Sequence, residues 1–151
     1  MTVEHPTHAL QGTLLSRRSL LVSAAGNAVV GRTSNNQFNF DFAVARFNPD
    51  GSPDLSFGNG GKVTTDFDGQ TDRAFALAIQ GDGKIVVAGS ATPASGISTD
   101  FAVARYDGAG APDGSFGSGG KLTTDIVGGI DIAQNIVVQP NGAILVSGVL
   151  T

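Results

Sequence analysis

The sequence predicts an all-β protein in which one structural unit of about 59 residues repeats along the chain. Three observations support this prediction. The residues DFAVARF at 41–47 return as DFAVARY at 100–106. Glycine makes up 22 of the 151 residues, about twice its usual share, which indicates frequent turns. Short runs rich in β-branched and aromatic residues alternate with turn residues, and helical periodicity is not sustained anywhere.

The repetition extends well beyond these seven residues. A shift of 59 places DFAVARFNPDGSPDLSFGNGGKVTTDF at 41–67 over DFAVARYDGAGAPDGSFGSGGKLTTDI at 100–126, with 18 of 27 residues identical. The same shift carries GKIVVAG at 83–89 onto GAILVSG at 142–148, and a shift of 57 carries GNAVVGR at 26–32 onto GKIVVAG. A period of this length is typical of a solenoid, a propeller or a similar stacked array.

Each unit contains four strand signals. In the best-defined unit they are AFALAIQ at 74–80, KIVVAGS at 84–90, DFAVARY at 100–106 and KLTTDI at 121–126. The first two are joined by Gly81-Asp82-Gly83, which predicts a tight turn with positive φ at glycine. Four antiparallel strands in each repeated unit is the plan of a β-propeller blade, so the predicted fold is about two and a half such blades.

The repeat also divides the chain. Residues 1–18 match it poorly and are expected to form an irregular N-terminal segment, while residues 19–151 form the repeat array. Within the array we expect the following units: unit one at 19–67, unit two at 74–126 and a half unit at 132–151.

Composition argues against several classes of function. The net charge of −4 and the absence of a basic stripe argue against nucleic-acid binding. The apolar stretches are too short for a membrane helix, so no membrane partner is expected. The chain has no cysteine, which excludes disulfides and thiolate metal sites but does not indicate the redox compartment.

The ordered motifs ALAIQGDGKIVVAG, DFAVARFNPDG and SFGNGGKVTTDF resemble the delta-60 repeat, a bacterial β-propeller-like repeat. The resemblance covers roughly residues 19–151. It implies a propeller of several units, commonly within a large secreted or cell-surface protein, and it implies no known activity.

Residues that recur in both units are expected to serve blade geometry, because a ligand site on a propeller need not be rebuilt in every blade. Six recurring residues are therefore assigned structural roles in packing and turns. They are Arg46, Asp54 and Phe57 in unit one, and Arg105, Asp113 and Phe116 in unit two.

Arg46 is the most informative of these residues. Strand alternation places it on the face of Phe42 and Val44, which neighbouring blades should cover, and a buried guanidinium needs a partner. Asp54 lies eight residues after Arg46, and the second unit keeps the same spacing. We hypothesise that each Arg forks onto the carboxylate of its own unit and pins the long loop. The alternative is an edge arginine in solvent.

No cofactor is predicted, and no metal-binding motif in the sequence is complete. NPDGSPD at 48–54 and DFDGQTD at 66–72 space oxygen ligands around a glycine, as calcium loops do, but neither ends in a bidentate Glu. Asp-Gly turns without metal are favoured for both stretches, with calcium as the alternative. His5 and His8 lie in the N-terminal segment without a carboxylate cluster to complete a metal shell.

An enzyme is not predicted, because no nucleophile and base can be paired from the sequence. We expect a non-enzymatic module that is structural or binds a protein or other ligand at loops on one rim. Residues 35–38 and 92–95, which do not recur, would cluster there. The alternative is a catalytic propeller, hydrolase or lyase-like, with its site on the central axis. That site would need polar groups from the first strand of each unit, and those strands are mainly apolar.

Two choices remain at the ends of the array. A twin-arginine export signal is one interpretation of the residues Ser16-Arg17-Arg18-Ser19-Leu20-Leu21. From Leu20 onward the same residues match the first hairpin of unit one, and we favour this second interpretation.

About two and a half units would leave apolar blade faces uncovered. We expect the partners to be other blades, supplied by a longer array or by further copies head to tail. A fragment or open array is favoured slightly over a three-fold ring of six blades.

Overall fold

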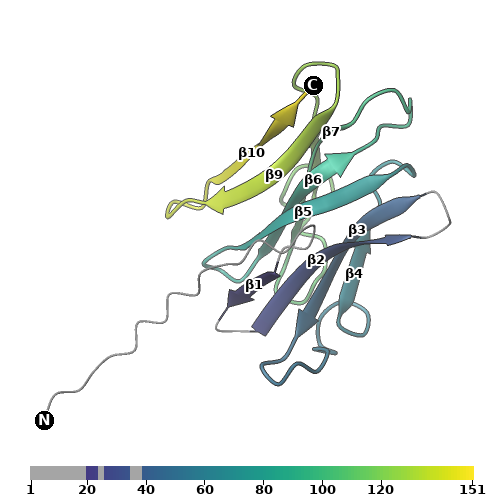
Figure 1. Cartoon of the computed structure of the whole chain (residues 1–151). Coiled ribbons are helices and arrows are strands. Elements are labelled where there is room, and N and C mark those ends of the chain that lie inside the picture. Colours follow the sequence, from purple (N-terminus) through teal and green to yellow (C-terminus); the bar gives the residue numbers. More distant parts are fainter. Residues whose placement is uncertain (1–19, 24–25, 35–38) are drawn as a thin grey trace, which may run out of the picture.

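The computed structural model describes residues 20–23, 26–34 and 39–151, and all regular elements in them are β-strands (Figure 1). No helix that could cross a membrane occurs in these ranges. The strands form three antiparallel sheets in chain order. The first holds β1 (Leu20–Ser23), β2 (Gly26–Ser34), β3 (Phe40–Phe47) and β4 (Lys62–Thr65); the second holds β5 (Asp72–Ile79), β6 (Ile85–Ala91), β7 (Asp100–Tyr106) and β8 (Lys121–Thr124); the third holds β9 (Asp131–Val138) and β10 (Ile144–Leu150).

The strand pattern confirms the all-β fold of four-stranded antiparallel units. Each of the four strand signals of the second unit is a strand of the second sheet, with small differences in extent. β5 begins at Asp72, because Asp72 and Arg73 still pair with Ala91 and Ser90 of β6. β8 ends at Thr124, where its pairing with β7 ends.

Two local predictions are also met by the backbone. Gly83 has a φ of 84°, and its N–H donates to Gln80 O at 2.9 Å, which closes the predicted tight turn. β1 pairs with β2 from Leu20↔Val29 to Ser23↔Gly26, as expected for the first hairpin of unit one. Residues 1–19, which include the whole predicted N-terminal segment, lie outside the described residues.

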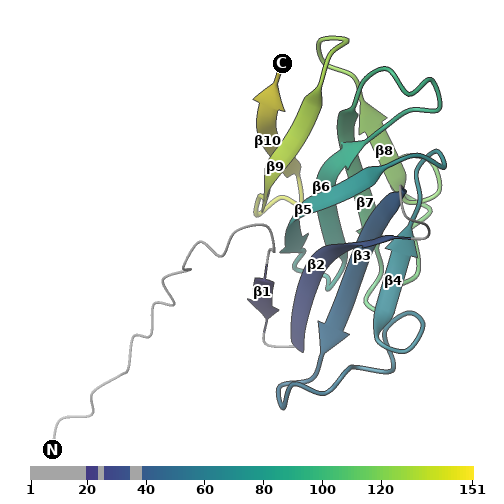
Figure 2. The same cartoon turned by 45° about the vertical axis from the view of Figure 1, so that its right-hand side comes forward.

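The second sheet lies between the other two (Figures 1 and 2). Its first strand, β5, contacts β2 and β3 of the first sheet, and β9 of the third sheet contacts β5, β6 and β7. The second sheet is therefore covered by a neighbouring sheet on each face.

β6 shows what this arrangement requires of the sequence. All of its residues from Ile85 to Ala91 are buried. Because successive side chains of a strand point to opposite faces, Ile85 and Val87 enter the core shared with the first sheet, while Val86 and Ala88 enter the core shared with the third. A strand covered on both faces has a continuous apolar sequence, and IVVA meets this requirement.

Gly89 of β6 is required by a close approach of two backbones. The pairing of β5 with β6 shifts between Ala74 and Ala76, so the bulged β5 backbone passes close to Gly89. A Cβ on Gly89 would lie 1.9 Å from Arg73 O, and a Cβ on Gly148 would lie at the same distance from Ile132 O. The recurring glycine of the second hairpin strand is thus explained by the bulge opposite it.

We predict that Gly89→Ala destabilises the protein by about 3 kcal/mol or more, because a methyl group there overlaps backbone that cannot move without breaking the β5–β6 pairing. Gly81→Ala is the matched control, since Gly81 does not have positive φ and a methyl group added to it would meet nothing within 4 Å. Urea unfolding of both variants at one protein concentration measures the difference. Equal stability of the two variants would contradict the backbone contact.

Candidate functional site

The first predicted ion pair lies in the long loop between β3 and β4. Arg46 Nε donates to Asp54 Oδ2 at 2.8 Å, and Arg46 Nη2 donates to Ser56 Oγ at 3.2 Å. The guanidinium carbon lies 4.7 Å from the centre of the Phe57 ring, within the range of a cation–π contact. The Arg46 side chain is 19% exposed, so it is not the solvent-exposed edge arginine of the alternative interpretation.

The geometry of this pair differs from the predicted fork. Asp54 Oδ1 already accepts hydrogen bonds from Ser56 N at 3.0 Å and Ser56 Oγ at 2.6 Å, which leaves one carboxylate oxygen for Arg46. The Ser56 hydrogen bonds, and then Arg46, lower the pKa of Asp54. Ser56 thus takes the place that a second guanidinium nitrogen would have occupied.

The second unit repeats this arrangement and adds a cation. Arg105 Nε lies 2.8 Å from Asp113 Oδ2, its guanidinium carbon lies 4.7 Å from the centre of the Phe116 ring, and Ser115 donates to Asp113 Oδ1. Lys84 Nζ also lies 3.1 Å from Asp113 Oδ2. Hydrogen bonds from Ser115, followed by Lys84 and the charge of Arg105, lower the pKa of Asp113 well below its usual range.

The arginine of unit one also reaches into unit two. Arg46 Nη1 donates to Gly108 O, and Gly58 N donates to Ala109 O at 2.8 Å. The Phe57 ring is completely buried, and a Cβ on Gly110 would lie 2.9 Å from it. We call this set the blade latch: Arg46, Asp54, Phe57 and residues 108–110.

Sequence reasoning missed residues 108–110 as latch partners. Their counterparts in unit one are Pro49, Asp50 and Gly51, so a comparison of the two copies shows a difference where the contact occurs. Gly108 and Ala109 leave their carbonyl oxygens accessible, and Gly110 allows the close approach of Phe57. The available signal was the small-residue stretch DGAG at 107–110.

The two stretches considered as calcium loops each use some of their carboxylate oxygens in local hydrogen bonds. In 48–54, Asp50 Oδ1 accepts from Ser52 N and Ser52 Oγ, a local pattern that is typical of turns with Asp. In 66–72, Asp66 Oδ1 accepts from Gly69 N at 2.6 Å, and Asp72 Oδ2 accepts from Phe67 N at 2.7 Å. The histidines considered as metal ligands, His5 and His8, lie outside the described residues.

An acidic cluster forms around the second of these stretches. Asp41, at the start of β3, joins Asp66 and Asp72, and one ligand oxygen from each lies within 4.8 Å of the others. Burial raises the pKa of Asp72 to about 7, and the pKa of Asp41 is raised by burial and by the charge of Asp66. Sequence reasoning identified 66–72 but missed Asp41, although the triad recurs at Asp100, Asp125 and Asp131.

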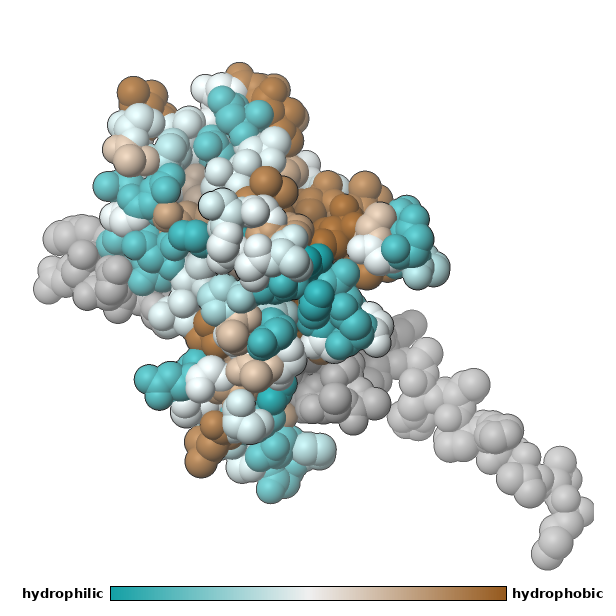
Figure 3. Space-filling model, turned by 180° about the vertical axis from the view of Figure 1, so that it is seen from behind, coloured by the Kyte–Doolittle hydropathy of each residue, from teal (hydrophilic) through white to brown (hydrophobic). Residues whose placement is uncertain are grey.

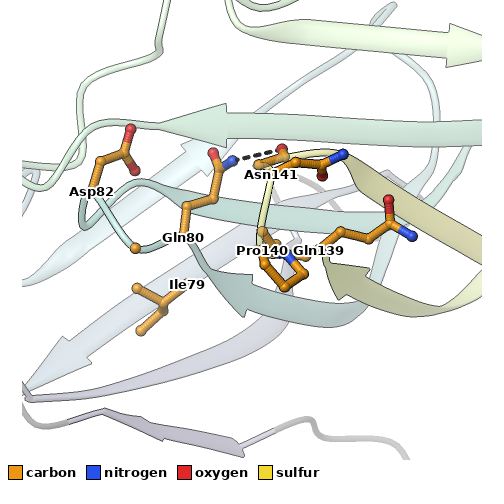
Figure 4. Close-up of a pocket in the computed structure, with 9 residues that line it drawn as sticks. Ile79, Gln80, Asp82, Gln139, Pro140 and Asn141 are labelled. Carbon is orange, nitrogen blue, oxygen red and sulfur yellow. Dashed lines mark hydrogen bonds between the residues drawn. The ribbon is translucent and has the colours of Figure 1, made fainter.

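A cleft of about 540 Å³ lies between the turns that end the first strands of the second and third sheets (Figure 4). Gln80 reaches across it and donates to Gly142 O at 3.4 Å. Asp82, Gln139 and Asn141 supply its other polar side chains. These groups can hydrogen-bond a polar ligand, and the lining holds no Ser, Thr, His, Lys or Tyr side chain among the described residues.

The comparison with protein families bears on the class of protein. Residues 28–57 and 80–116 match the family described as "Domain of unknown function (DUF5122) beta-propeller". The first matched stretch ends at Phe57, and the second ends at its counterpart in unit two, Phe116. Together the two stretches contain all six residues assigned structural roles. With the antiparallel sheets, this similarity places the fold among the β-propellers and supports a β-propeller-like repeat family. A comparison with curated proteins found no match.

We predict that Arg46→Met lowers the free energy of unfolding by about 2 kcal/mol, because Asp54 loses its cation and Gly108 O loses its donor. Arg105→Met is the matched control and is expected to cost less than about 1 kcal/mol, because Lys84 still neutralises Asp113. Chemical denaturation measures both. Equal losses would show that the contact with unit two contributes nothing.

The lowered pKa of Asp113 predicts an acid-dependent contribution to stability. A carboxyl with a depressed folded pKa stabilises the fold above its unfolded pKa, about 4, and loses this contribution as the pH falls toward the folded value. The stability gap between the wild type and Asp113→Asn should therefore narrow below about pH 4. Urea midpoints measured from neutral to acidic pH test this, and a gap that is constant with pH would contradict it.

Proposed function

We propose that this chain is a non-enzymatic β-propeller module that associates with further blades through an apolar sheet face. The supporting observation is a contrast between equivalent positions of the repeat. Val86 in β6 is completely buried, whereas its counterpart Leu145 in β10 is 59% exposed. Phe67 after β4 is 8% exposed, whereas its counterpart Ile126 after β8 is 48% exposed. Each buried member lies at a junction that a following sheet covers.

The outer face of the third sheet carries exposed apolar side chains, and we call it the open face. It comprises Val137, Leu145 and Val149, on the side of β9 and β10 opposite to Ile136, Ile144 and Val146, which pack against the core of Val86 and Ala88. Figure 3 shows hydrophobic surface gathered over the part of the molecule that holds β9 and β10.

The chemistry of the open face favours another blade as its partner. The position equivalent to Leu145 in the second sheet, Val86, already packs against the third sheet, so a further sheet of the same repeat is a suitable partner for the open face. Contiguous exposed apolar surface drives association in water. The partner blade belongs either to the same protein or to another copy of the chain, in an open array or a closed ring.

The latch supports the same proposal. In unit two, Arg105, Asp113 and Phe116 are assembled as in unit one, and Phe116 is only partly buried while Phe57 is fully buried. A following blade that supplies small residues equivalent to 108–110 would cover Phe116. Unit two thus presents the receiving half of a blade latch.

The cleft at Gln80 and Gln139 favours a second candidate, which is binding of a small polar ligand at the turns that end the first strands of the second and third sheets. Hydrolase or lyase chemistry there would depend on Asp82 as the single ionisable group of the lining among the described residues. Location in a secreted or cell-surface protein is a further part of the proposal and is supported by the resemblance to the delta-60 repeat.

Association of the purified chain tests the proposal. We predict that its mass in light scattering rises with protein concentration, and that Leu145→Asp reduces this rise by placing a charge on the open face. Leu55→Asp is the matched control, because Leu55 is 75% exposed in the β3–β4 loop and lies outside the open face.

Each result has a defined meaning. A sharp trimer would favour the closed ring, and a mass that keeps growing would favour the open array. A wild-type chain that stays monomeric and folded at all concentrations would contradict association through copies. Equal association of Leu145→Asp and Leu55→Asp would show that the open face is not the interface.

A further inference from the structure

We propose that Asp41, Asp66 and Asp72 bind a calcium ion at the junction between the first and second sheets. Asp41 belongs to β3, Asp66 follows β4, and Asp72 is the first residue of β5. The site would therefore join the last two strands of one blade to the first strand of the next. This inference is independent of the association proposed above.

The spacing of the oxygens suits calcium. One ligand oxygen from each carboxylate lies within 4.8 Å of the others. Calcium binds carboxylate oxygens at about 2.3–2.6 Å, so two oxygens on opposite sides of the ion are about 5 Å apart. Magnesium requires a stricter octahedron at about 2.0–2.1 Å and usually keeps several of its waters, so a site with three carboxylates from the protein favours calcium.

The state of Asp72 points to a ligand. Its side chain has no solvent exposure, and Oδ2 accepts the hydrogen bond from Phe67 N. Oδ1 is buried and has no hydrogen-bond partner among the described residues. Buried polar atoms are nearly always satisfied by protein, water or an ion, so the unpartnered oxygen marks a position for a further ligand.

The charges of Asp66 and Asp72 favour a cation. Among the residues whose side chains the structure describes, no Lys or Arg nitrogen lies within 4 Å of the carboxylates of Asp66 or Asp72. Lys121 comes from β8 of the next sheet, but its Nζ donates to the backbone oxygen of Asp66 at 2.9 Å. Lys121 therefore positions the loop through the backbone and does not pair with the carboxylate of Asp66.

The second unit repeats the arrangement that surrounds Asp72. Asp131 is also fully buried, its Oδ2 accepts from Ile126 N at 2.6 Å, and its Oδ1 also lacks a hydrogen-bond partner within the part of the chain that the structure describes. Asp100 and Asp125 occupy the positions of Asp41 and Asp66. The unpartnered oxygen is therefore a regular feature of the blade junction, whereas three carboxylate oxygens within 4.8 Å of one another are found, among the described residues, at Asp41, Asp66 and Asp72.

Thermal unfolding of the full chain with and without calcium chloride tests the proposal. At a hundredfold excess over the dissociation constant, calcium is expected to raise the melting temperature by roughly 5 °C or more. Magnesium chloride at equal ionic strength should have a smaller effect. Calorimetric titration of the chelator-treated chain with calcium chloride gives the affinity directly.

Three variants assign the effect to this cluster. Asp72→Asn should abolish the calcium-dependent rise, and Asp66→Asn, at an exposed position, provides a second variant if Asp72→Asn does not fold. Asp50→Asn is the matched control, because Asp50 lies in the other stretch considered as a calcium loop and should leave the rise unchanged.

The proposal fails if the wild-type chain shows neither heat of binding nor a rise in melting temperature at about 10 mM calcium, which exceeds the dissociation constants of the weakest protein calcium sites. It also fails if Asp66→Asn and Asp72→Asn respond to calcium as the wild type does. Loss of the response in Asp50→Asn alone would assign the ion to residues 48–54.

Discussion

Burial of both faces of a sheet is the constraint on which the rest of this structure depends. The second sheet places Ile85 and Val87 in one core and Val86 and Ala88 in another, so it needs a neighbour on each side. A sheet with this sequence cannot satisfy both faces within its own unit. Stacking of successive units follows directly, because each sheet covers the apolar face of the one before it.

Apolar burial holds the sheets together, and polar contacts help to set how they are placed. Dispersion and hydrophobic forces have little directionality, so polar contacts add defined directions to the placement that core packing sets. Arg46 and Gly58 bond to the backbone of residues 108–109, and the Tyr106 hydroxyl lies 2.6 Å from Thr65 Oγ1. These bonds have defined lengths and directions, and each links the first sheet or its loop to the second unit.

The same junction also explains why acidic residues gather between the blades. The connection from β4 to β5 must turn within a few residues, and Asp66 and Asp72 cap backbone N–H groups in that turn. Capping by carboxylates brings negative charge to a place that the next sheet buries. A proton or a cation is needed to compensate that charge, which links the turn chemistry to the proposed calcium site.

The junction between the first and second sheets therefore combines three parts within the described residues, which are an apolar core, a blade latch and an acidic cluster. The second unit carries the receiving half of a latch and the acidic counterparts. This asymmetry between equivalent positions is the physical basis for the proposed role of the module in blade association.

The sequence by itself determined the features that arise within one unit. Strand alternation, turn residues and the repeat of 59 residues predicted the strands of the second sheet and the turn at Gly83. The pairs of Arg46 with Asp54 and of Arg105 with Asp113 were also accessible, because eight residues separate the partners and the strand and its loop bring them together. Such contacts depend on local geometry, which the sequence pattern encodes.

Only the tertiary structure decided the contacts between units. Gly108 lies 62 residues from Arg46 along the chain, and no periodicity indicates which backbone oxygen the guanidinium meets. Asp41 joins Asp66 and Asp72 because β3 and β5 belong to adjacent sheets. These outcomes depend on the distance and twist between sheets, which are set by the packing of all the side chains in the core at once.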